Sequence, residues 1–510
     1  MQSDTAAPER PGEEDRPDAP PVPAAIAETH SSVVVFLGDR AYKVKKRVDL
    51  GFLDYRTREA REEACHREVA LNRRLAPDVY LGVADVVGTD GQPCDHLIVM
   101  RRMPPDRRLA TLVRNGEDVD DHLWHLAHLL AAFHARAERG AAADVAAGRD
   151  ALAGRWAHNT AEMLALAGSC LDPGAVREVD RRAQRYLAGR EPLFRARVAE
   201  GRACDGHGDL LAEDIFLLDD GPRVLDCIEF DARLRLGDTL ADVAFLAMDL
   251  ERMGRPDLAD RFLAAYREHA DDNWPPSLAH HHVAYRAQVR AKVAAIRATQ
   301  GGEGAETEAR GLLALAHRHL EAGAVRLVMV GGSPGTGKTT LAAALADALG
   351  ATAIRSDEVR KEQSGLRPDQ SGAAGFGQGI YRPEKTAETY GEMLRRARVA
   401  LAHGESVVLD ASFTAAASRR RARAIAGATA SDVVELRCTA PPVMAAARIR
   451  QRLAAGGDAS DATPAIAAAL AAAADPWPEA SAVDTTGAPR STLRDALSIV
   501  RDRGQKGLPS

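Results

Sequence analysis

The chain has few aromatic residues, few cysteines and no excess of positive charge. Aromatic residues make up 4% of its 510 residues, and the formal net charge is −6. Proteins that bind nucleic acid or anionic membranes through their overall charge carry an excess of lysine and arginine, so this balance argues against both partners. The six cysteines are scattered and contain no Cys-x-x-Cys pair. This pattern predicts reduced thiols in a cytoplasmic protein.

Long apolar runs are missing as well. No stretch of 18 consecutive apolar residues occurs, so we expect no membrane-spanning helix. The first 27 residues are rich in Pro, Glu, Asp and Ala. That composition is unlike a signal peptide and predicts a disordered tail over residues 1–27.

One glycine-rich segment carries most of the information about chemistry. The run Gly332-Ser-Pro-Gly-Thr-Gly-Lys-Thr339 matches G-x-x-x-x-G-K-[ST] at every required position. An apolar run (325–330) precedes it and an Ala/Leu-rich run (340–349) follows, which is the strand–loop–helix context that a P-loop needs. We expect Lys338 at the β/γ-phosphates of ATP and the Thr339 hydroxyl at Mg²⁺. The predicted nucleotide-binding residues are Gly332, Ser333, Pro334, Gly335, Thr336, Gly337, Lys338, Thr339 and Thr340.

The chain around and after this loop alternates between predicted strands and helices. Further strands are expected at 353–355, 406–409 and 433–437, with helical patterns between them. Such alternation predicts an α/β P-loop domain with a parallel sheet that is covered on both faces. We place this domain at residues 323–503.

Acidic and basic residues follow the predicted strands, where parallel sheets bind their ligands. Asp357 is placed to accept a proton from a substrate hydroxyl, and Arg360 lies one helical turn later to bind the transferred group. Asp410 ends a buried strand and is predicted to share Mg²⁺ with Thr339.

Three arginines, at positions 448, 450 and 452, recur on a later predicted helix. They suggest a mobile lid whose guanidinium groups, those of Arg448 and Arg452, neutralise charge on the γ-phosphate. Another basic run, at 419–423, has no interleaved aromatic residues. It therefore favours a solvated helix over a nucleic-acid patch.

The first half of the chain contains a second set of acids. The segment His207-Gly-Asp-Leu-Leu-Ala-Glu-Asp-Ile215 has the form H-G-D-x-x-x-x-D, and Asp226 follows further on. Phosphoryl transfer needs a carboxylate that orients the attacking hydroxyl and oxygen ligands that hold Mg²⁺. Asp209 suits the first role, and Asp214 with Asp226 suits the second.

These motifs resemble the catalytic core of aminoglycoside phosphotransferases and other protein-kinase-like small-molecule kinases. The resemblance implies an α+β kinase-like domain, which we place at residues 28–322. It also implies a strand lysine that binds the α/β-phosphates of ATP and a helix glutamate that holds this lysine. Lys43 and Glu68 match that pair. Lys45 lies two residues along the same strand and faces the same side, so it remains an alternative to Lys43.

The C-terminal part resembles the zeta-toxin, chloramphenicol-phosphotransferase and polynucleotide-kinase group of P-loop kinases, through the P-loop and the pattern Ser356-Asp-x-x-Arg360. The whole chain resembles bacterial proteins described as bifunctional aminoglycoside phosphotransferase/ATP-binding protein. This resemblance implies two kinase-type modules that use ATP and Mg²⁺ and phosphorylate hydroxyl groups of small molecules. It does not fix either acceptor or the oligomeric state.

Two other functions are compatible with these residues. The resembled kinases usually have Asn where this chain has Asp214, and a carboxylate adds repulsion towards phosphate. The first module could therefore be a pseudokinase that regulates the P-loop kinase. The second alternative is a polynucleotide 5′-kinase in the C-terminal part, against which the acidic charge balance argues.

Overall fold

The computed structural model describes residues 24–29, 31–49, 51, 53–166, 170–367, 370, 377–455 and 459–506. Contacts within the chain divide it into two units. The first unit combines Met1–His122 with Ala212–Ala232, and the second combines Leu123–Leu211 with Arg233–Ser510. The predicted domain boundary near residue 322 thus falls inside the second unit.

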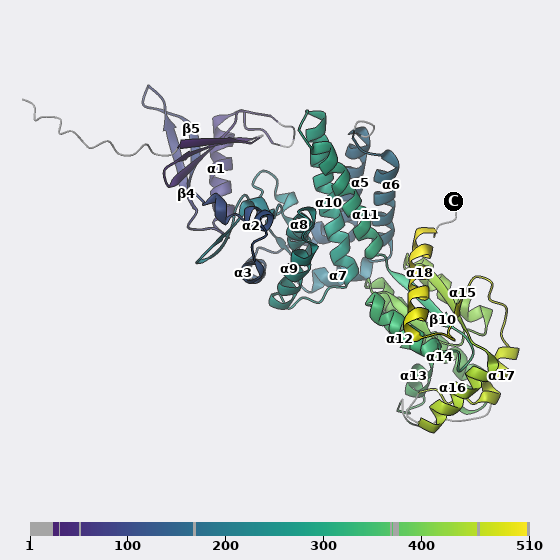
Figure 1. Ribbon diagram of the computed structural model, residues 1–510. Helices are drawn as coiled ribbons and strands as arrows, with labels where there is room; N and C mark the ends of the chain where they lie inside the picture. Colours follow the sequence, from purple (N-terminus) through teal and green to yellow (C-terminus); the bar gives the residue numbers. More distant parts are fainter. Residues whose placement is uncertain are drawn as a thin grey trace, which may run out of the picture. The chain divides into compact units, whose positions relative to one another are not determined.

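The first unit is built on a five-stranded antiparallel sheet in the order β1-β2-β3-β5-β4. Helix α1 (Arg58–Asn72) packs on this sheet (Figure 1), and its Cys65 joins Ile98 in a buried core. The helix begins after Thr57, whose hydroxyl accepts a hydrogen bond of 3.2 Å from the amide of Ala60 and so satisfies a free N–H of the first turn. This arrangement confirms the predicted α+β start. The strands are β1 (Ala24–Glu28), β2 (Ser32–Leu37), β3 (Arg40–Lys45), β4 (Tyr80–Val87) and β5 (Pro93–Arg101).

The second segment of the first unit forms a hairpin. Strand β7 (Ile215–Leu218) pairs antiparallel with β8 (Gly221–Val224). The helical turns of this unit are η1 (Pro105–Arg107), α2 (Leu109–Asn115) and η2 (Ala212–Asp214).

The predicted tail over residues 1–27 needs correction at its end, because residues 24–28 form β1. This strand pairs with β2, and Ile26 lies opposite Val35. The outer edge of β2 offers unpaired backbone N–H and C=O groups, which a short extended segment can satisfy regardless of its composition. Residues 1–23 lie outside the part of the chain that the structure describes.

The second unit begins inside α3 and is mostly helical up to residue 322. Helices α5, α6, α10 and α11 run side by side (Figure 1) and contact one another. Strands β6 (Ala203–Asp205) and β9 (Leu236–Asp238) pair antiparallel between the helices, and η3 (Ala232–Leu234) precedes β9. The helices are α3 (Asp120–Arg136), α4 (Ala141–Ala147), α5 (Arg149–Leu166), α6 (Pro173–Ala188), α7 (Glu191–Ala199), α8 (Thr239–Arg252), α9 (Pro256–His269), α10 (Pro276–Thr299) and α11 (Ala305–Ala322).

The chain between residues 173 and 199 forms two helices, α6 and α7, rather than one. Gly189 and Arg190 separate the end of α6 from the start of α7. A side chain at position 189 would collide with the backbone carbonyl of Thr429, and the buried Arg190 guanidinium donates a hydrogen bond of 2.6 Å to that carbonyl. The break therefore depends on a segment more than two hundred residues away.

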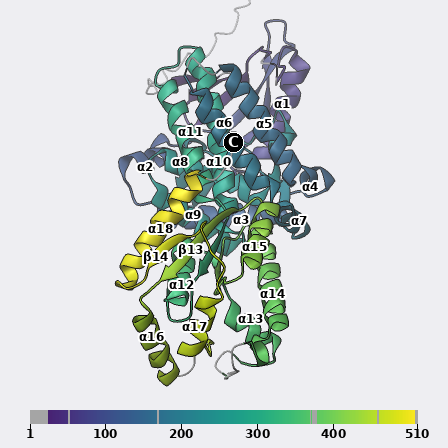
Figure 2. The same ribbon diagram turned by 90° about the vertical axis from the view of Figure 1, so that its right-hand side faces the viewer.

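The remainder of the second unit is an α/β domain with a five-stranded parallel sheet in the order β11-β12-β10-β13-β14. Helices α12 and α18 lie on one side of the sheet, and α14 and α15 lie on the other (Figure 2). This confirms the predicted parallel sheet covered on both faces. The strands are β10 (Arg326–Gly331), β11 (Thr352–Arg355), β12 (Val407–Asp410), β13 (Asp432–Thr439) and β14 (Ser481–Asp484). The helices are α12 (Lys338–Leu349), α13 (Ser356–Gln363), η4 (Gly379–Tyr381), α14 (Pro383–Ala402), α15 (Ala416–Ala428), α16 (Pro442–Ala455), α17 (Pro464–Ala472) and α18 (Pro489–Lys506).

Within the second unit, the helical part and the α/β part share a packed boundary. Arg185 of α6 forms an ion pair of 2.9 Å with Asp432 at the start of β13. The Ser277 hydroxyl of α10 donates a hydrogen bond of 2.6 Å to the carbonyl of Gly404. The helical part and the α/β part are therefore joined within one unit, with no boundary at residue 322.

Candidate active sites

Two lysines and three carboxylates gather in the first unit. The Lys43 ammonium lies 2.8 Å from Glu68 Oε1 and 2.6 Å from Asp226 Oδ1. The Lys45 ammonium lies 2.5 Å from Glu68 Oε2 and also pairs with Glu229. Burial acts to lower the pKa of Lys43, but Asp226 and Glu68 outweigh it and hold this pKa well above its ordinary value. Lys43 is therefore a fixed positive charge.

The geometry distinguishes the two lysines that the sequence left as alternatives. Lys43 contacts Asp226, whereas Lys45 is only 2% exposed and turns to Glu229. The Tyr55 hydroxyl donates a hydrogen bond of 2.9 Å to the same Glu229 carboxylate. Glu229 was missed from the sequence; the only available signal was an acid three residues after Asp226.

The two acids predicted to bind Mg²⁺ flank the β7–β8 hairpin. The amide of Leu225 donates a hydrogen bond of 2.9 Å to the carbonyl of Asp214, which extends the hairpin ladder by one pair and places Asp214 opposite the residue that precedes Asp226. Asp226 has a φ of 65°, a left-handed backbone that Asp adopts more readily than most residues. Carboxylate oxygens are the ligands that Mg²⁺ prefers, so this pair suits the metal.

The loop that carries Asp209 lies in the second unit and is held by Asp242. The Asp242 carboxylate accepts hydrogen bonds of 2.8 Å from each of the amides of His207 and Gly208, and its Oδ2 lies 3.1 Å from His134 Nε2. Burial acts to raise the pKa of Asp242, but these hydrogen bonds and the nearby histidines hold it below the ordinary range. An ionised Asp242 therefore fixes the backbone immediately before Asp209.

Arg286 of α10 supports the same loop from another side. It donates hydrogen bonds of 2.9 Å to the carbonyl of Ala241 and 3.4 Å to that of Gly208. Burial lowers the pKa of Arg286, and Asp209 is among the charged groups that oppose this shift. Asp209 thus interacts electrostatically with the buried Arg286 guanidinium.

The P-loop has the conformation that the sequence predicts. Gly335 and Gly337 have φ values of 82° and 81°, which residues with a Cβ rarely adopt. The Thr336 hydroxyl closes the loop by donating a hydrogen bond of 2.7 Å to the carbonyl of Ser333. Helix α12 begins at Lys338, so its N-terminus faces the loop and adds positive potential for phosphate.

The segment after β14 braces the P-loop from outside, which the sequence did not indicate. The Thr485 hydroxyl donates a hydrogen bond of 2.7 Å to the carbonyl of Thr336. Arg448 of α16 in turn donates a hydrogen bond of 2.7 Å to the carbonyl of Thr485. One of the two predicted lid arginines is therefore linked to the P-loop through a single residue.

Asp410 ends β12 next to the P-loop helix. Burial raises the pKa of Asp410, opposed by Lys338 and by a hydrogen bond with Thr339. Its Oδ1 is buried and has no hydrogen-bond partner among the described residues. A buried carboxylate oxygen beside a threonine hydroxyl is a donor set that fits Mg²⁺, as the sequence predicts for Thr339 and Asp410.

The remaining predicted residues of the second site have partners within the protein. Arg360 binds Asp357 at 2.9 Å and stacks over the ring of Tyr381, with 4.7 Å between the guanidinium carbon and the ring centroid. Asp357 thus lies in the first turn of α13 and already holds a cation. Arg452 donates a hydrogen bond of 2.9 Å to the carbonyl of Ala462, whereas Arg450 is exposed.

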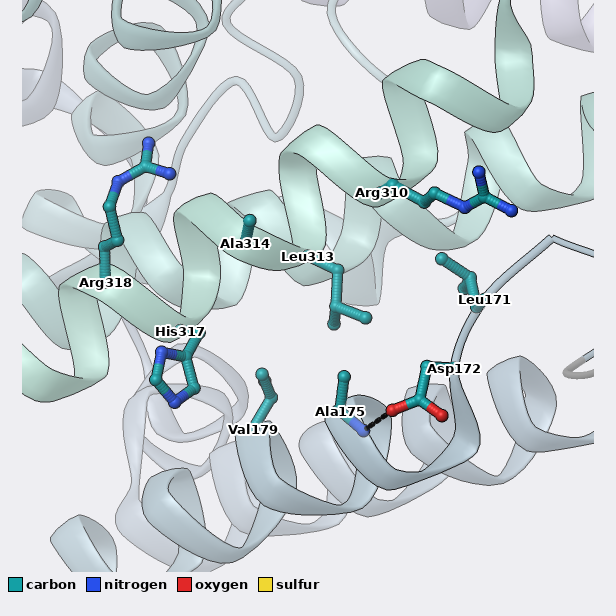
Figure 3. A pocket seen from close by; sticks show the side chains of 9 residues that line it. All are labelled: Leu171, Asp172, Ala175, Val179, Arg310, Leu313, Ala314, His317 and Arg318. Carbon is teal, nitrogen blue, oxygen red and sulfur yellow. Dashed lines mark hydrogen bonds between the residues drawn. The ribbon is translucent and has the colours of Figure 1, made fainter. Parts of the chain in front are cut away.

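A separate pocket of about 370 Å³ lies between α6 and α11 (Figure 3). Leu313 and Val179 point into it, and Asp172 at its edge caps α6 through a hydrogen bond of 2.7 Å from the amide of Ala175. None of the predicted site residues lines this pocket. It is therefore distinct from both candidate active sites.

Neither a ready-made metal cluster nor a membrane-spanning helix is found among the described residues. No group of three or more His, Cys, Asp or Glu side chains in this part of the chain is arranged to hold a metal. Over the same residues, no helix combines the length and apolar character that crossing a membrane requires.

Comparison with known proteins supports both halves. A family model described as "Phosphotransferase enzyme family" matches residues 24–279, and one described as "AAA domain" matches residues 327–477. Uncharacterized proteins of Mycobacterium tuberculosis (strain H37Rv) and Mycobacterium bovis are each 43% identical over 478 residues, which is 93% of this chain and 95% of theirs.

Two solved structures match parts of this chain at low identity. A gluconokinase from Sinorhizobium meliloti is 17% identical, and the match covers 36% of this chain and 94% of that one, with a TM-score of 0.27. The GDP complex of wild-type aminoglycoside 2′-phosphotransferase-IIIa is 13% identical, and the match covers 60% of this chain and 94% of that one, with a TM-score of 0.35.

Proposed function

The chain belongs to the phosphotransferase enzyme family, and from this premise we propose that it is an ATP- and Mg²⁺-dependent phosphotransferase with two kinase-type modules. Each module transfers the γ-phosphoryl group of ATP to a hydroxyl group of a small-molecule acceptor. The observation that carries the proposal is that two unrelated folds in one chain each place a buried or partly buried lysine beside Mg²⁺-type oxygen donors.

The first module is the kinase-like domain predicted over residues 28–322. In this module, Lys43 binds the α/β-phosphates and Glu68 holds it in place. Asp214 and Asp226 hold Mg²⁺, which when bound neutralises charge on the phosphates. Asp209 orients the acceptor hydroxyl and takes its proton as the acceptor oxygen bonds to the γ-phosphorus. The bond from that phosphorus to the bridging oxygen breaks, and ADP leaves with the electron pair.

In the second module, the P-loop amides surround the β-phosphate and Lys338 contacts the β/γ-phosphates. Thr339 and Asp410 are the protein ligands for Mg²⁺. Asp357 accepts the proton of the acceptor hydroxyl, and Arg360, Arg448 and Arg452 stabilise charge on the transferred group. The ion pair between Arg360 and Asp357 holds this carboxylate in place before the acceptor arrives.

Phosphate transfer from labelled ATP to components of a small-molecule extract tests both modules. Lys338→Ala removes the P-loop cation, and Asp209→Asn removes the first module's base without changing its shape. We expect each variant to lose about 10²–10³-fold in labelling of one set of products and to leave the other set intact. If neither variant changes any labelled product, the proposed function is wrong.

A second function for the first module has one specific observation in its favour, the carboxylate of Asp214 where Asn is usual. In that case the module binds ATP without transferring it and regulates the P-loop kinase. Asp214→Asn separates the two, because an active kinase module keeps or gains transfer when the extra negative charge is removed. If the first module binds ATP but transfers no phosphate with either Asp or Asn at position 214, the regulatory function is supported.

A further inference from the structure

The Lys43 site contains a further buried ion pair, between Lys45 and Glu229, that the phosphotransfer chemistry does not use. Glu68 is fully buried and divides its carboxylate between two cations, with Oε1 at 2.8 Å from Lys43 and Oε2 at 2.5 Å from Lys45. Lys45 is shielded from solvent and cannot reach a bound nucleotide without leaving its partners. Glu229, 9% exposed, takes the other side of Lys45 and is fixed by the Tyr55 hydroxyl.

The charges of this cluster explain why a second lysine is needed. Glu68 and Glu229 are both buried, and a buried carboxylate without a cation is costly. If Lys45 were absent, Lys43 would be the only ammonium group left for these two carboxylates and for Asp226. The Lys43 ammonium would then be attracted to these carboxylates and would interact less with the phosphates of ATP.

We propose that Lys45 and Glu229 are positioning residues for the nucleotide lysine: their ion pair satisfies the far side of Glu68, so that Lys43 can present its charge to the phosphates of ATP. This inference rests on the proposed function of the first module. Neither Lys45 nor Glu229 touches the nucleotide or the acceptor. Their effect is transmitted through Glu68 and through the balance of charge around Lys43.

The test uses the full chain with Lys338→Ala, so that the P-loop does not contribute to ATP binding. Affinity for Mg²⁺·ATP is measured by calorimetry, and affinity for adenosine, which has no phosphate, is measured by ligand-observed NMR. We expect Lys45→Met to weaken Mg²⁺·ATP binding by at least about tenfold, as for a buried charge left unpaired, while adenosine binding stays unchanged. Lys46→Met is the matched control, because this neighbouring lysine pairs with exposed Glu28 instead, and it should leave both affinities unchanged.

A second variant separates charge balance from simple packing. Adding Glu229→Gln to Lys45→Met removes the unpaired carboxylate, and we expect it to recover Mg²⁺·ATP affinity to within about threefold of the parent. Lys45→Arg, which keeps the charge, should also stay close to the parent. If Lys45→Met fails to fold, the double variant and Lys45→Arg still decide the question.

The outcomes distinguish this inference from the function on which it rests. If Lys43→Met leaves Mg²⁺·ATP affinity unchanged, the nucleotide site of the first module is wrong. If Lys43→Met weakens binding but Lys45→Met does not, the positioning role is overturned while the function stands. It is also overturned if Lys45→Met loses adenosine and ATP equally, or if Glu229→Gln makes the Lys45→Met variant weaker still.

Discussion

The two candidate nucleotide sites of this chain are built in opposite ways. The P-loop presents backbone amides from one short segment, Gly332–Thr339, which is held open by glycines with positive φ. The first-module site uses side chains, and Lys43 meets Asp226 across 183 residues of sequence. A site made of local backbone depends on small residues at fixed positions, whereas a site made of distant side chains depends on balanced buried charge. The two sites should therefore fail under different substitutions.

The largest expected effect comes from a side chain added to the P-loop. At Gly335, a Cβ would collide with the carbonyl of Ala445 on α16. We expect Gly335→Ala to lower ATP affinity at this site by about 100-fold or more, because the loop must move to relieve both the collision and the unfavourable φ, each of which costs about 1–2 kcal/mol. Calorimetric titration in a Lys43→Met background measures the P-loop site alone.

Gly350→Ala provides the matched control for this substitution. Gly350 has a φ of 57°, but a Cβ added there would meet no atom within 4 Å. Gly350→Ala should therefore lower the free energy of unfolding through backbone strain and leave ATP affinity unchanged. Equal ATP affinities for the two variants would contradict this explanation of why the P-loop needs its glycines.

The next effect concerns the loop that carries Asp209, where long-range polar contacts set the geometry. Asp242→Asn cannot accept from all three of its donors, and we expect it to lower the free energy of unfolding by about 2–3 kcal/mol at neutral pH. Denaturant unfolding monitored by tryptophan fluorescence measures this loss. Asp257→Asn is a suitable control, because that carboxylate lies on the surface among arginines.

The pH dependence of this loss has a definite sign. The pKa of Asp242 in the folded chain is below its ordinary value, which is about 3.9 in an unfolded chain. The stabilisation is therefore fully present above about pH 4 and is lost as the pH falls through the folded pKa. A gap between wild type and Asp242→Asn that widens on acidification below about pH 4 would refute this assignment.

A smaller effect is expected at Asp410, the proposed metal ligand of the P-loop site. Asp410→Asn should raise the Mg²⁺ concentration needed for half-maximal ATP binding by about tenfold, because a neutral amide is a weaker ligand than a carboxylate. Burial raises the pKa of Asp410, so protons should compete with Mg²⁺ at a higher pH than for an ordinary carboxylate. The Mg²⁺ requirement of wild type should rise on acidification, and that of Asp410→Asn should rise less.

The smallest effect is expected on α16. Arg448→Ala should reduce transfer by the second module by only about threefold to tenfold, because it removes a half-buried arginine that braces the P-loop through Thr485 and that we propose to stabilise the transferred group. Arg450→Ala, on the exposed side of the same helix, should have no effect. Equal losses in both variants would indicate a general effect of helix charge.

The difference between a site of local backbone and a site of distant side chains also determines how much of each could be predicted from the sequence. The P-loop, its helix and the parallel sheet follow from adjacent residues, so periodicity and one motif were sufficient. Asp410 was also predictable, because it ends an apolar strand. Lys43 and Glu68 were predicted through a family resemblance, and the contact between Lys43 and Asp226 became visible only in the fold.

Features that depend on distant partners were missed for a physical reason. Glu229 has no local pattern, since its meaning comes from Lys45, which is 184 residues away. Thr485 braces the P-loop across 149 residues. The break between α6 and α7 depends on the backbone of Thr429, and β1 exists because β2 offers an edge. None of these contacts leaves a spacing or periodicity in its own segment.

The most direct test of the account is the stoichiometry of nucleotide binding. Titration of the full chain with Mg²⁺ and a non-hydrolysable ATP analogue should show two equivalents bound per chain. Lys338→Ala and Lys43→Met should each retain a different one of the two, and the double variant should bind none. A wild-type chain that binds one equivalent, or a double variant that still binds two, would contradict the claim that two unrelated folds each hold a triphosphate.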